Sequence, residues 1–503
     1  MDERPHARSA LVMAPISRRT VLIVGGAGVG AVVVGGIAAA IGTRTPVPSA
    51  PSGSPVSGSS TTSAPGALPL PTVLRSANGR LDVALTAAAS AVAIGGTPVR
   101  ALTYNGGLPG PTLVVRPGDV LSIALTNALP DPTNLHTHGL QVSPEGNADN
   151  VFRRVDPGET ADYRIEIPAE HPPGTFWYHP HHHGMTADQV FGGLYGAILV
   201  EDGDADAAAD RLMIISDIAF DAAGDVATVS MAEMMTGREG ATVLVNGALR
   251  PTITARPGDI ERWRIINACT SRFLDLRLDG HALQLLGIDG GRFAAPADVT
   301  GIRMMPGNRA DVLVTVGEAD AVLRAEPVSR GTAGMMGNQT TTGAPVTLAD
   351  LVVDAAATPR PSPPPAALVA GASRDLRDAA VDRSRTLTLA MGGGMRFTID
   401  GVAFDPSVVN HRVVAGAVEE WELVNTSTMD HPFHLHVWPM QLLRVGSSTI
   451  DGVDWRDVVE VPAGSSTVVR ISFDGIVGTT VYHCHILDHE DQGMMGTIAV
   501  AEA

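Results

Sequence analysis

Four histidine pairs of the form His-x-His give this 503-residue chain its most specific chemical signal. The pairs are His136/His138, His179/His181, His434/His436 and His483/His485. Because a β-strand directs residues i and i+2 to the same face, each pair aims two imidazoles in one direction. Imidazole suits transition-metal ions, and a structural zinc site would need only four ligands. Eight histidines therefore predict a cluster of metal ions.

A second set of ligand types surrounds the last two pairs. It consists of His431, Cys484, His489 and Met494. Two histidines, one cysteine and a weak axial methionine are the ligands of a blue-copper electron-transfer site. This interpretation uses Cys484 as a ligand and leaves Cys269 as a free, buried thiol, although two cysteines in an exported protein could also form a disulfide.

The tripeptide His483-Cys484-His485 joins the two kinds of site. In an extended strand, the side chain of Cys484 points to one side and its two neighbours point to the other. A copper ion held by Cys484 would then lie only a few covalent bonds from a cluster held by His483 and His485. The tripeptide predicts an electron route between the two centres.

The chain repeats one module three times. Gly118, Gly258 and Gly416 are each followed nine residues later by an asparagine, with alternating apolar residues between. The asparagines are Asn127, Asn267 and Asn425. This pattern indicates a turn that leads into a half-buried strand, and a Pro-Gly or Pro-Ala-Gly signal precedes a second strand in each copy. Such a long period indicates duplicated domains rather than a solenoid.

These repeats predict three β-sandwiches, at residues 75–203, 204–356 and 384–503. A stiff, proline-rich linker is expected at 357–383. The first and third domains carry histidine pairs nine and eleven residues after the repeated asparagine, whereas the second has Leu276 and Leu278 there. We therefore expect a metal site between the two outer domains and interpret the second domain as a spacer.

Composition favours an all-β protein and argues against nucleic-acid binding. Lys and Arg number 35 against 53 Asp and Glu, which gives a formal net charge of −18. Phosphate backbones are bound by clusters of basic residues, so no nucleic-acid partner is expected. Abundant Gly and Pro, with short alternating apolar runs such as residues 120–125, indicate strands joined by many turns.

The first 74 residues are predicted to be an export signal and a tether. Ser17-Arg18-Arg19-Thr20 has the form of a twin-arginine signal, and an apolar stretch at residues 21–41 follows it. Residues 1–42 are therefore predicted to be a signal peptide or, if uncleaved, a membrane anchor. A Pro/Ser/Gly/Thr-rich stretch at 43–74 is expected to be a disordered linker. We expect a monomer that is secreted or held at the outer cell surface.

The histidine motifs resemble the copper-binding motifs of the multicopper oxidases. They read His136-Thr137-His138-Gly139, His179-Pro180-His181, His431-Pro432-Phe433-His434-Leu435-His436 and His483-Cys484-His485 through Met494. The chain is similar to the bacterial three-domain branch of laccase-like enzymes and copper-efflux oxidases. This resemblance implies cupredoxin-like Greek-key domains. It also implies four one-electron oxidations of a small donor, of the phenol or aniline type, coupled to reduction of O2 to water.

The resemblance also implies four copper ions per chain and assigns a role to each residue by position. His431, Cys484, His489 and Met494 would hold the type 1 copper, and His136 and His434 the type 2 copper. The two type 3 coppers would be held by His138, His179 and His485 and by His181, His436 and His483. Glu490 matches an acid that relays protons to the cluster, and Asp149 or Asn147 stands where the family often has an acid near the type 2 copper.

An oxidase for Cu(I) or another low-valent metal ion is the main alternative. Its soft ligands would be Met231, Met234, Met235, Met335 and Met336, which we interpret instead as gap-filling residues. Copper-efflux oxidases typically have a long Met-rich insert, reduced here to Met391-Gly392-Gly393-Gly394-Met395. Ser427 stands where those enzymes tend to place an aspartate. These departures favour an organic donor.

A copper-free structural relative is a further alternative, but it would be expected to have lost ligands. A copper nitrite reductase is disfavoured because it has no use for paired type 3 histidines. The remaining histidines are interpreted as solvent-facing or supporting residues without a ligand role. They are His171, His182, His183, His281 and His411.

Overall fold

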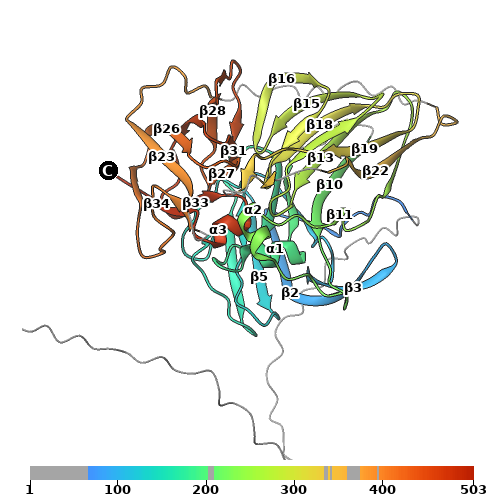
Figure 1. Ribbon diagram of the computed structural model, residues 1–503, viewed down its shortest axis with the longest axis horizontal. Coiled ribbons are helices and arrows are strands. Elements are labelled where there is room, and N and C mark those ends of the chain that lie inside the picture. Colours follow the sequence, from blue (N-terminus) through green and yellow to red (C-terminus); the bar gives the residue numbers. More distant parts are fainter. Residues whose placement is uncertain (1–65, 202–208, 334–337, 340–342, 359–373, 393–395) are drawn as a thin grey trace, which may run out of the picture. The chain divides into compact units, whose positions relative to one another are not determined.

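The computed structural model describes residues 66–201, 209–333, 338–339, 343–358, 374–392 and 396–503. Its sheets fall into three groups in chain order, coloured blue to cyan, green to yellow, and orange to red (Figure 1). The predicted signal or anchor, the following linker up to residue 65 and residues 359–373 lie outside the described residues, as do Met335, Met336 and Met395. Among the described residues, no helix is long and apolar enough to cross a membrane.

The first group pairs two sheets. In hydrogen-bonding order, one contains β1 (Val73–Arg75), β4 (Thr112–Val115), β9 (Gly196–Val200), β8 (Gly174–His179) and β6 (His136–His138). The other contains β3 (Thr97–Tyr104), β2 (Arg80–Ile94), β5 (Val120–Asn127) and β7 (Thr160–Glu166). Strands β6 and β8 are antiparallel, with His136 opposite His179. This register brings the first two histidine motifs together.

The second group has the same layered plan. One sheet contains β11 (Thr242–Val245), β10 (Ala209–Ile218), β13 (Ile260–Asn267), β18 (Arg309–Thr315), β15 (Ala282–Ile288) and β16 (Gly291–Val299). The other contains β12 (Thr252–Ala255), β22 (Val346–Val353), β19 (Ala321–Glu326), β14 (Leu274–Leu278) and β17 (Ile302–Met304). Strands β20 (Thr332–Ala333) and β21 (Asn338–Gln339) pair separately. Leu276 and Leu278 on β14 lie in the hydrophobic core.

The third group carries the last two histidine motifs. One sheet contains β24 (Arg396–Ile399), β23 (Arg383–Gly392), β26 (Val418–Asn425), β32 (Ser466–Ser472), β28 (Met440–Val445) and β29 (Ser448–Thr449), with β30 (Trp455–Arg456) on β28. The other contains β25 (His411–Val414), β34 (Met495–Ala501), β33 (Gly478–Cys484), β27 (His431–Leu435) and β31 (Val458–Val461). His434 lies opposite His483.

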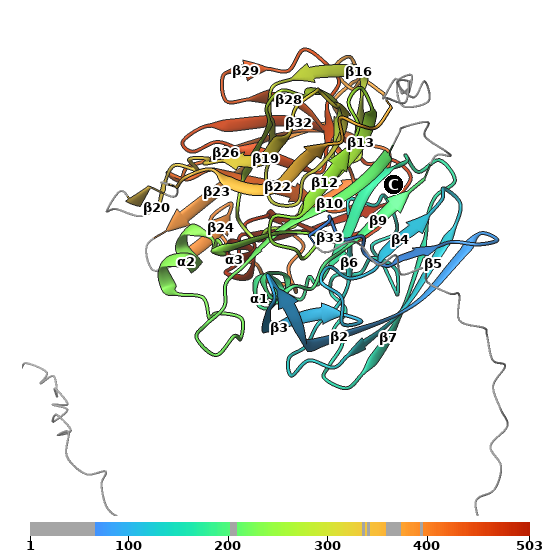
Figure 2. The same ribbon diagram turned by 90° about the vertical axis from the view of Figure 1, so that its right-hand side faces the viewer.

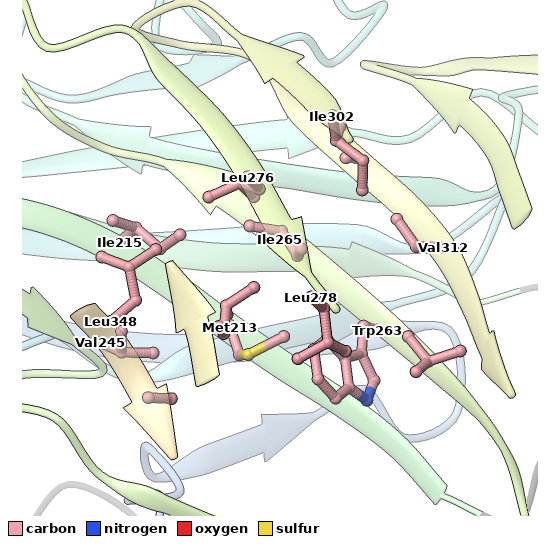
Figure 3. Packing of buried hydrophobic residues seen from close by; sticks show 14 of the residues in the cluster. Met213, Ile215, Val245, Trp263, Ile265, Leu276, Leu278, Ile302, Val312 and Leu348 are labelled. Carbon is pink, nitrogen blue, oxygen red and sulfur yellow. The ribbon is translucent and has the colours of Figure 1, made fainter. Parts of the chain in front are cut away.

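Each group encloses its own hydrophobic core between its sheets. Figure 3 shows the core of the second group, where Trp263 and Val312 from one sheet and Leu278 from the other lie in one cluster. Each fully buried side chain of this kind contributes about 1.5–3 kcal/mol. Buried and half-buried residues alternate along β5, which indicates that one face of this strand packs against a hydrophobic core. The all-β fold class is confirmed.

The repeated asparagine has the same structural role in each group. The side-chain amide of Asn127 donates to Asp131 O and Val155 O, and its Oδ1 accepts from Leu129 N. Asn267 and Asn425 make the equivalent three bonds. The asparagine thus fixes the chain where it leaves one sheet for the next, directly before the histidine motifs of the outer groups.

The described residues form the short helices α1 (Thr186–Gly192), α2 (Met231–Thr236) and α3 (Leu487–Asp491). They lie close together in both ribbon views (Figures 1 and 2), although each belongs to a different group of strands. Helix α3 begins three residues after β33 ends at Cys484 and carries His489 and Glu490. The strand that carries Cys484 therefore also positions α3.

Both predicted linkers end earlier than expected. Leu68 is buried in the core of the second group, its N–H donates to Thr252 O, and β1 begins at Val73, so residues 66–74 are not disordered. Leu376 is also fully buried, and its N–H donates to Gln441 Oε1 of the third group. In each polar, proline-rich stretch a single leucine provides an apolar anchor that average composition does not reveal.

Candidate metal centre

A sulfur-containing group of side chains lies within the third group of strands. Cys484 ends β33, His431 begins β27, and His489 lies on α3. The distances from Cys484 Sγ are 3.4 Å to His431 Nδ1 and 3.9 Å to His489 Nδ1. Met494 is fully buried, and its carbonyl accepts from Cys484 N at 3.0 Å. The structure thus brings together the first three residues predicted for the type 1 site, with Met494 adjoining.

Polar partners hold the opposite nitrogen of both imidazoles. His431 Nε2 lies 2.8 Å from Ser427 Oγ, and His489 Nε2 lies 3.2 Å from the carbonyl of Met235 on α2. Because a carbonyl only accepts, His489 Nε2 carries the proton and Nδ1 is left for a metal ion. Burial lowers the pKa of His431 to about 3. Burial also raises the pKa of the Cys484 thiol well above its usual range, so binding of a cation would be needed to favour the thiolate.

Eight buried histidines from the first and third groups converge into one cluster. Three sets have ligand-capable atoms within 4.8 Å of one another: His136, His138 and His434; His138, His179 and His485; and His181, His436 and His483. Rings from the two groups interleave, since His136 stacks on His436 and His138 on His434, each with centroids 4.0 Å apart. All eight residues predicted from the spacing therefore lie together.

Many nitrogens in this cluster are buried without a hydrogen-bond partner. They are His136 Nε2, His138 Nδ1, His179 Nε2, His434 Nε2, His436 Nδ1 and both ring nitrogens of His485. Each such atom costs about 1–3 kcal/mol, so native proteins leave few of them. In addition, His483 Nε2 lies 3.1 Å from His181 Nε2 and 3.0 Å from His436 Nε2. This ring nitrogen can take part in only one hydrogen bond, so the other contact is left unsatisfied. Bound transition-metal ions would satisfy these lone pairs, and imidazole with thiolate fits copper.

Fixed acceptors select the tautomer of several of these histidines. His434 Nδ1 lies 2.7 Å from Asp457 O, and His179 Nδ1 lies 2.8 Å from Pro180 O. The proton therefore sits on Nδ1, and Nε2 is left free to bind a metal ion. Burial, and in most cases positive charge on neighbouring histidines, lowers the pKa of all eight below the usual value. The imidazoles are thus held in the neutral, ligating form.

Two buried acids adjoin the cluster. Asp149 lies 2.9 Å from His136 Nδ1 and accepts from Thr137 N, and burial raises the pKa of Asp149 to about 7. Asn147, the alternative at this position, is exposed. Glu490 lies 3.2 Å from His483 Nδ1. Burial, followed by the charge of Asp491, raises the pKa of Glu490 well above its usual range. Both carboxyl groups are therefore able to hold a proton near neutral pH.

The other singled-out histidines lie outside these ligand sets. His182 and His183 line a surface pocket of about 410 Å³, which His181 also borders. His171 accepts from Gln141 N, and His281 accepts from Gly317 N. Of the methionines, Met235 packs against the core of the third group, but the gap-filling interpretation is wrong for Met231, whose side chain is 70% exposed. Met231 is the first residue of the exposed helix α2, and the sequence did not indicate this helix.

Sequence reasoning missed two residues that contact the cluster and one that supports them. Asp457 approaches His138 and His434, Arg309 binds Asp457, and Gly307 packs against His485. Pro306-Gly307 was noted only as a turn in the repeat, and the second group of strands was interpreted as a spacer. Arg309 and Asp457 are 148 residues apart, so local spacing carried no signal of their contact.

Three β-sandwiches in series, with a histidine cluster shared by the first and third, are typical of a transition-metal protein. The chain belongs to the multicopper oxidase family, whose profiles match residues 86–205, 214–347 and 378–503. The predicted family and the class of oxidoreductase with O2 as acceptor are thereby confirmed, and membership of the family implies copper as the metal.

Known relatives include proteins with different names. A multicopper oxidase of Staphylococcus aureus is 29% identical over 415 residues, which cover 80% of this chain and 84% of the relative. The cell division protein FtsP of Sodalis glossinidius is 30% identical over 464 residues, covering 87% and 92%. The solved structure of a multicopper oxidase from Campylobacter jejuni, described as a metallo-oxidase, matches with a TM-score of 0.75 and 27% identity, covering 87% of this chain and 97% of that one.

Proposed function

We propose that the chain binds four copper ions and couples four one-electron oxidations of a small donor to the reduction of O2 to two waters. Type 1 copper would be held by His431, Cys484, His489 and Met494, type 2 by His136 and His434, and the type 3 pair by His138, His179 and His485 and by His181, His436 and His483. When bound, copper supplies electron uptake at the first centre and O2 reduction at the second.

The arrangement around Cys484 carries this proposal. Its sulfur faces His431 and His489, whereas His483 and His485 on either side each belong to a different set of the histidine cluster. The two centres are therefore linked by the backbone of consecutive, fully buried residues. Burial excludes water from this link. On this proposal a donor is oxidised near α3, while O2 is reduced within the histidine cluster.

The two acids are proposed to supply protons. Reduction of O2 to two waters consumes four protons, and the cluster itself is buried. Glu490 approaches His483, and Asp149 approaches His136, so the two carboxyl groups reach different histidines of the cluster. Their raised pKa values favour proton storage near neutral pH.

We favour a phenol- or aniline-type donor. Ser427, a neutral hydroxyl, contacts His431 Nε2 at the position where copper-efflux oxidases tend to have an aspartate. A methionine at the axial position of type 1 copper is expected to lower the potential relative to leucine or phenylalanine, and this suits easily oxidised donors.

Oxidation of Cu(I) or another low-valent metal ion is the second candidate. Met231 is exposed on α2, and the carbonyl of Met235 on the same helix contacts His489. A thioether is a soft ligand of the kind that Cu(I) prefers. The description of the Campylobacter jejuni relative as a metallo-oxidase also supports this candidate.

Oxygen uptake by copper-loaded protein tests the proposal. The donors are 2,6-dimethoxyphenol and Cu(I), each measured with and without excess Cu(II), and copper per chain is determined first. We expect four copper ions, an intense thiolate-to-copper absorption that is lost in Cys484→Ser, and faster uptake with the phenol. Faster uptake with Cu(I) would favour the second candidate. If neither donor supports oxygen uptake, or if the chain binds no copper, the result would exclude an oxidase and favour a copper-free role.

We further propose that the protein acts as a monomer outside the cytoplasm. The location outside the cytoplasm is supported by Arg18-Arg19 and the apolar stretch at 21–41. Replacing both arginines with lysine should retain the chain in the cytoplasm, as fractionation would reveal. Export of the double variant at the original level would contradict a twin-arginine signal. N-terminal sequencing of the exported chain would distinguish a cleaved signal from an anchor.

A further inference from the structure

The second group of strands contributes no proposed ligand, yet one of its loops forms a wall of the histidine cluster. This loop, residues 305–308, lies between β17 and β18. A Cβ atom added to Gly307 would lie 2.9 Å from His485 Nε2 and 3.1 Å from His138 Cε1. The backbone of the loop therefore packs directly against histidines from both outer groups, where a residue with a side chain would not fit.

Arg309 begins β18 directly after this loop and is fully buried. Its Nη1 and Nη2 donate to the two carboxylate oxygens of Asp457, each at 2.6 Å. Its Nε donates to Thr175 O at 3.0 Å, and Nη1 also reaches Gly307 O at 3.2 Å. One side chain from the second group thus bonds to the first and third groups beside the cluster.

Asp457 connects Arg309 to two histidines of the cluster. Its Oδ1 lies 3.1 Å from His138 Nε2, and its main-chain carbonyl accepts from His434 Nδ1 at 2.7 Å. A guanidinium fork fixes the plane of the carboxylate that it binds. With the carboxylate as acceptor, His138 Nε2 carries the proton and Nδ1, which has no hydrogen-bond partner, is the free ligand atom.

Asp289 supports the pair from the other side. Its Oδ2 accepts from the main-chain N–H groups of Asp457 and Val458, and its Oδ1 accepts from Arg309 N. Burial lowers the pKa of Arg309, but the carboxylates of Asp457 and Asp289 more than offset this effect, so the guanidinium stays charged. Gly139 leaves no spare room, since an added Cβ there would lie 2.3 Å from Arg309 Nη2 and 2.8 Å from Asp457 Oδ2.

We propose that Arg309 is a positioning residue for the copper cluster. Through Asp457 it holds His138 and His434 in the tautomers that turn their opposite nitrogens toward the metal ions. On this proposal the second domain would set the geometry of the type 2 and type 3 coppers without supplying a ligand, and would be more than a spacer. This inference rests on the proposed function.

Arg309→Lys in the full-length, copper-loaded protein tests this role. Lysine keeps the charge but loses the fork. We expect an altered type 2 electron paramagnetic resonance spectrum and about 10- to 100-fold weaker retention of that copper against a chelator. The type 1 absorption should be unchanged, because no type 1 ligand contacts Arg309. Arg262→Lys is the matched control: Arg262 is also buried and binds Asp311 through a fork, but among the described residues Asp311, unlike Asp457, forms no hydrogen bond with a histidine of the cluster, so copper retention should stay at the wild-type level.

A wild-type type 2 spectrum and affinity in Arg309→Lys would overturn the inference. Equal losses of type 1 and type 2 copper would also overturn it, because they would indicate a general folding defect. Asp457→Asn provides a second variant of the same size, and it should change the type 2 spectrum while sparing the type 1 absorption. A wild-type chain that lacks a type 2 signal would contradict the proposed function instead, so this measurement comes before any variant.

Discussion

Ser427 has a defined hydrogen-bond direction beside the sulfur-containing centre. Its hydroxyl donates to Asn425 Oδ1 at 2.7 Å and therefore accepts from His431 Nε2 at 2.8 Å. Ser427→Ala removes the acceptor that selects this tautomer. We expect type 1 copper to be retained about tenfold more weakly, with an unchanged type 2 spectrum. Chelator titration followed at the type 1 absorption measures this, with the exposed Ser407→Ala as control. Equal retention in both variants would contradict the prediction.

His171 provides a pH-dependent contribution to stability away from the proposed ligands. Burial lowers the pKa of His171 to about 4, against about 6.5 in an unfolded chain. The unfolded state therefore binds the proton first, and stability falls as the pH drops from about 6.5 toward 4. Above pH 6.5 this residue contributes no pH dependence.

His171→Gln tests this contribution. Between pH 7.5 and pH 5.0 the wild type should lose about 2 kcal/mol more unfolding free energy than the variant. This value follows because stability falls by about 1.4 kcal/mol for each pH unit below about 6.5. Urea unfolding of the two metal-free proteins at both pH values measures the difference, since all other titrating groups are shared. Parallel losses in the two proteins would exclude His171 as the source.

Residue types and short offsets predicted the members of the histidine cluster, because strand geometry converts i, i+2 spacing into a shared face. The same offsets in the first and third repeats predicted that two domains share one site. Supporting residues such as Asp457 and Arg309 were not predictable in this way. Their roles come from contacts between distant parts of the chain, which no local pattern records.

At the scale of elements, helix α3 depends on a buried ion pair. Asp488 on α3 accepts from the main-chain N–H, Nε and Nη2 of Arg238, and Nη1 of Arg238 binds Asp188 on α1 at 2.6 Å. Helix α3 also carries His489 and Glu490. The pair therefore connects the strands of the second group to a helix that bears a proposed ligand and a proposed proton donor.

Arg238→Ala should destabilise the protein by about 3–5 kcal/mol, because it leaves Asp488 buried without its partner. Chemical unfolding of the metal-free protein measures this. Arg75→Ala is the control: Arg75 pairs with Glu201 at 2.6 Å but is 60% exposed, so its loss should cost less than about 1 kcal/mol. Similar losses in the two variants would contradict the role of the buried pair.

The strands of the repeat were predictable, but the short helices were not. Alternating apolar residues and turn signals indicated strands such as β5 and β26. Helix α2 has no buried residue and α3 has five residues, so neither offers a helical apolar period long enough to detect. The early ends of both linkers depended on two buried leucines, Leu68 and Leu376, which the overall polar and proline-rich composition of the two stretches did not reveal.

At the scale of the whole molecule, the two kinds of copper site are built differently. The proposed type 1 ligands all come from the third group of strands, whereas the proposed type 2 and type 3 ligands come from the first and third groups together. Copper in the cluster should therefore couple the unfolding of the outer domains, and type 1 copper should stabilise only the third.

Removal of copper tests this coupling. A ligand that binds only the folded state at 1,000 times its Kd adds about 4 kcal/mol of stability per site. Calorimetry should record separable transitions for the metal-free chain and one merged, higher transition for the copper-loaded chain. Cys484→Ser should keep the merged transition, because it removes only the type 1 site. His136→Ala should lower the temperature of the merged transition without splitting it, because type 2 copper loses one of its two proposed ligands while both type 3 ligand sets still come from the two outer domains. Identical thermograms with and without copper would mean that the metal ions do not join the outer domains.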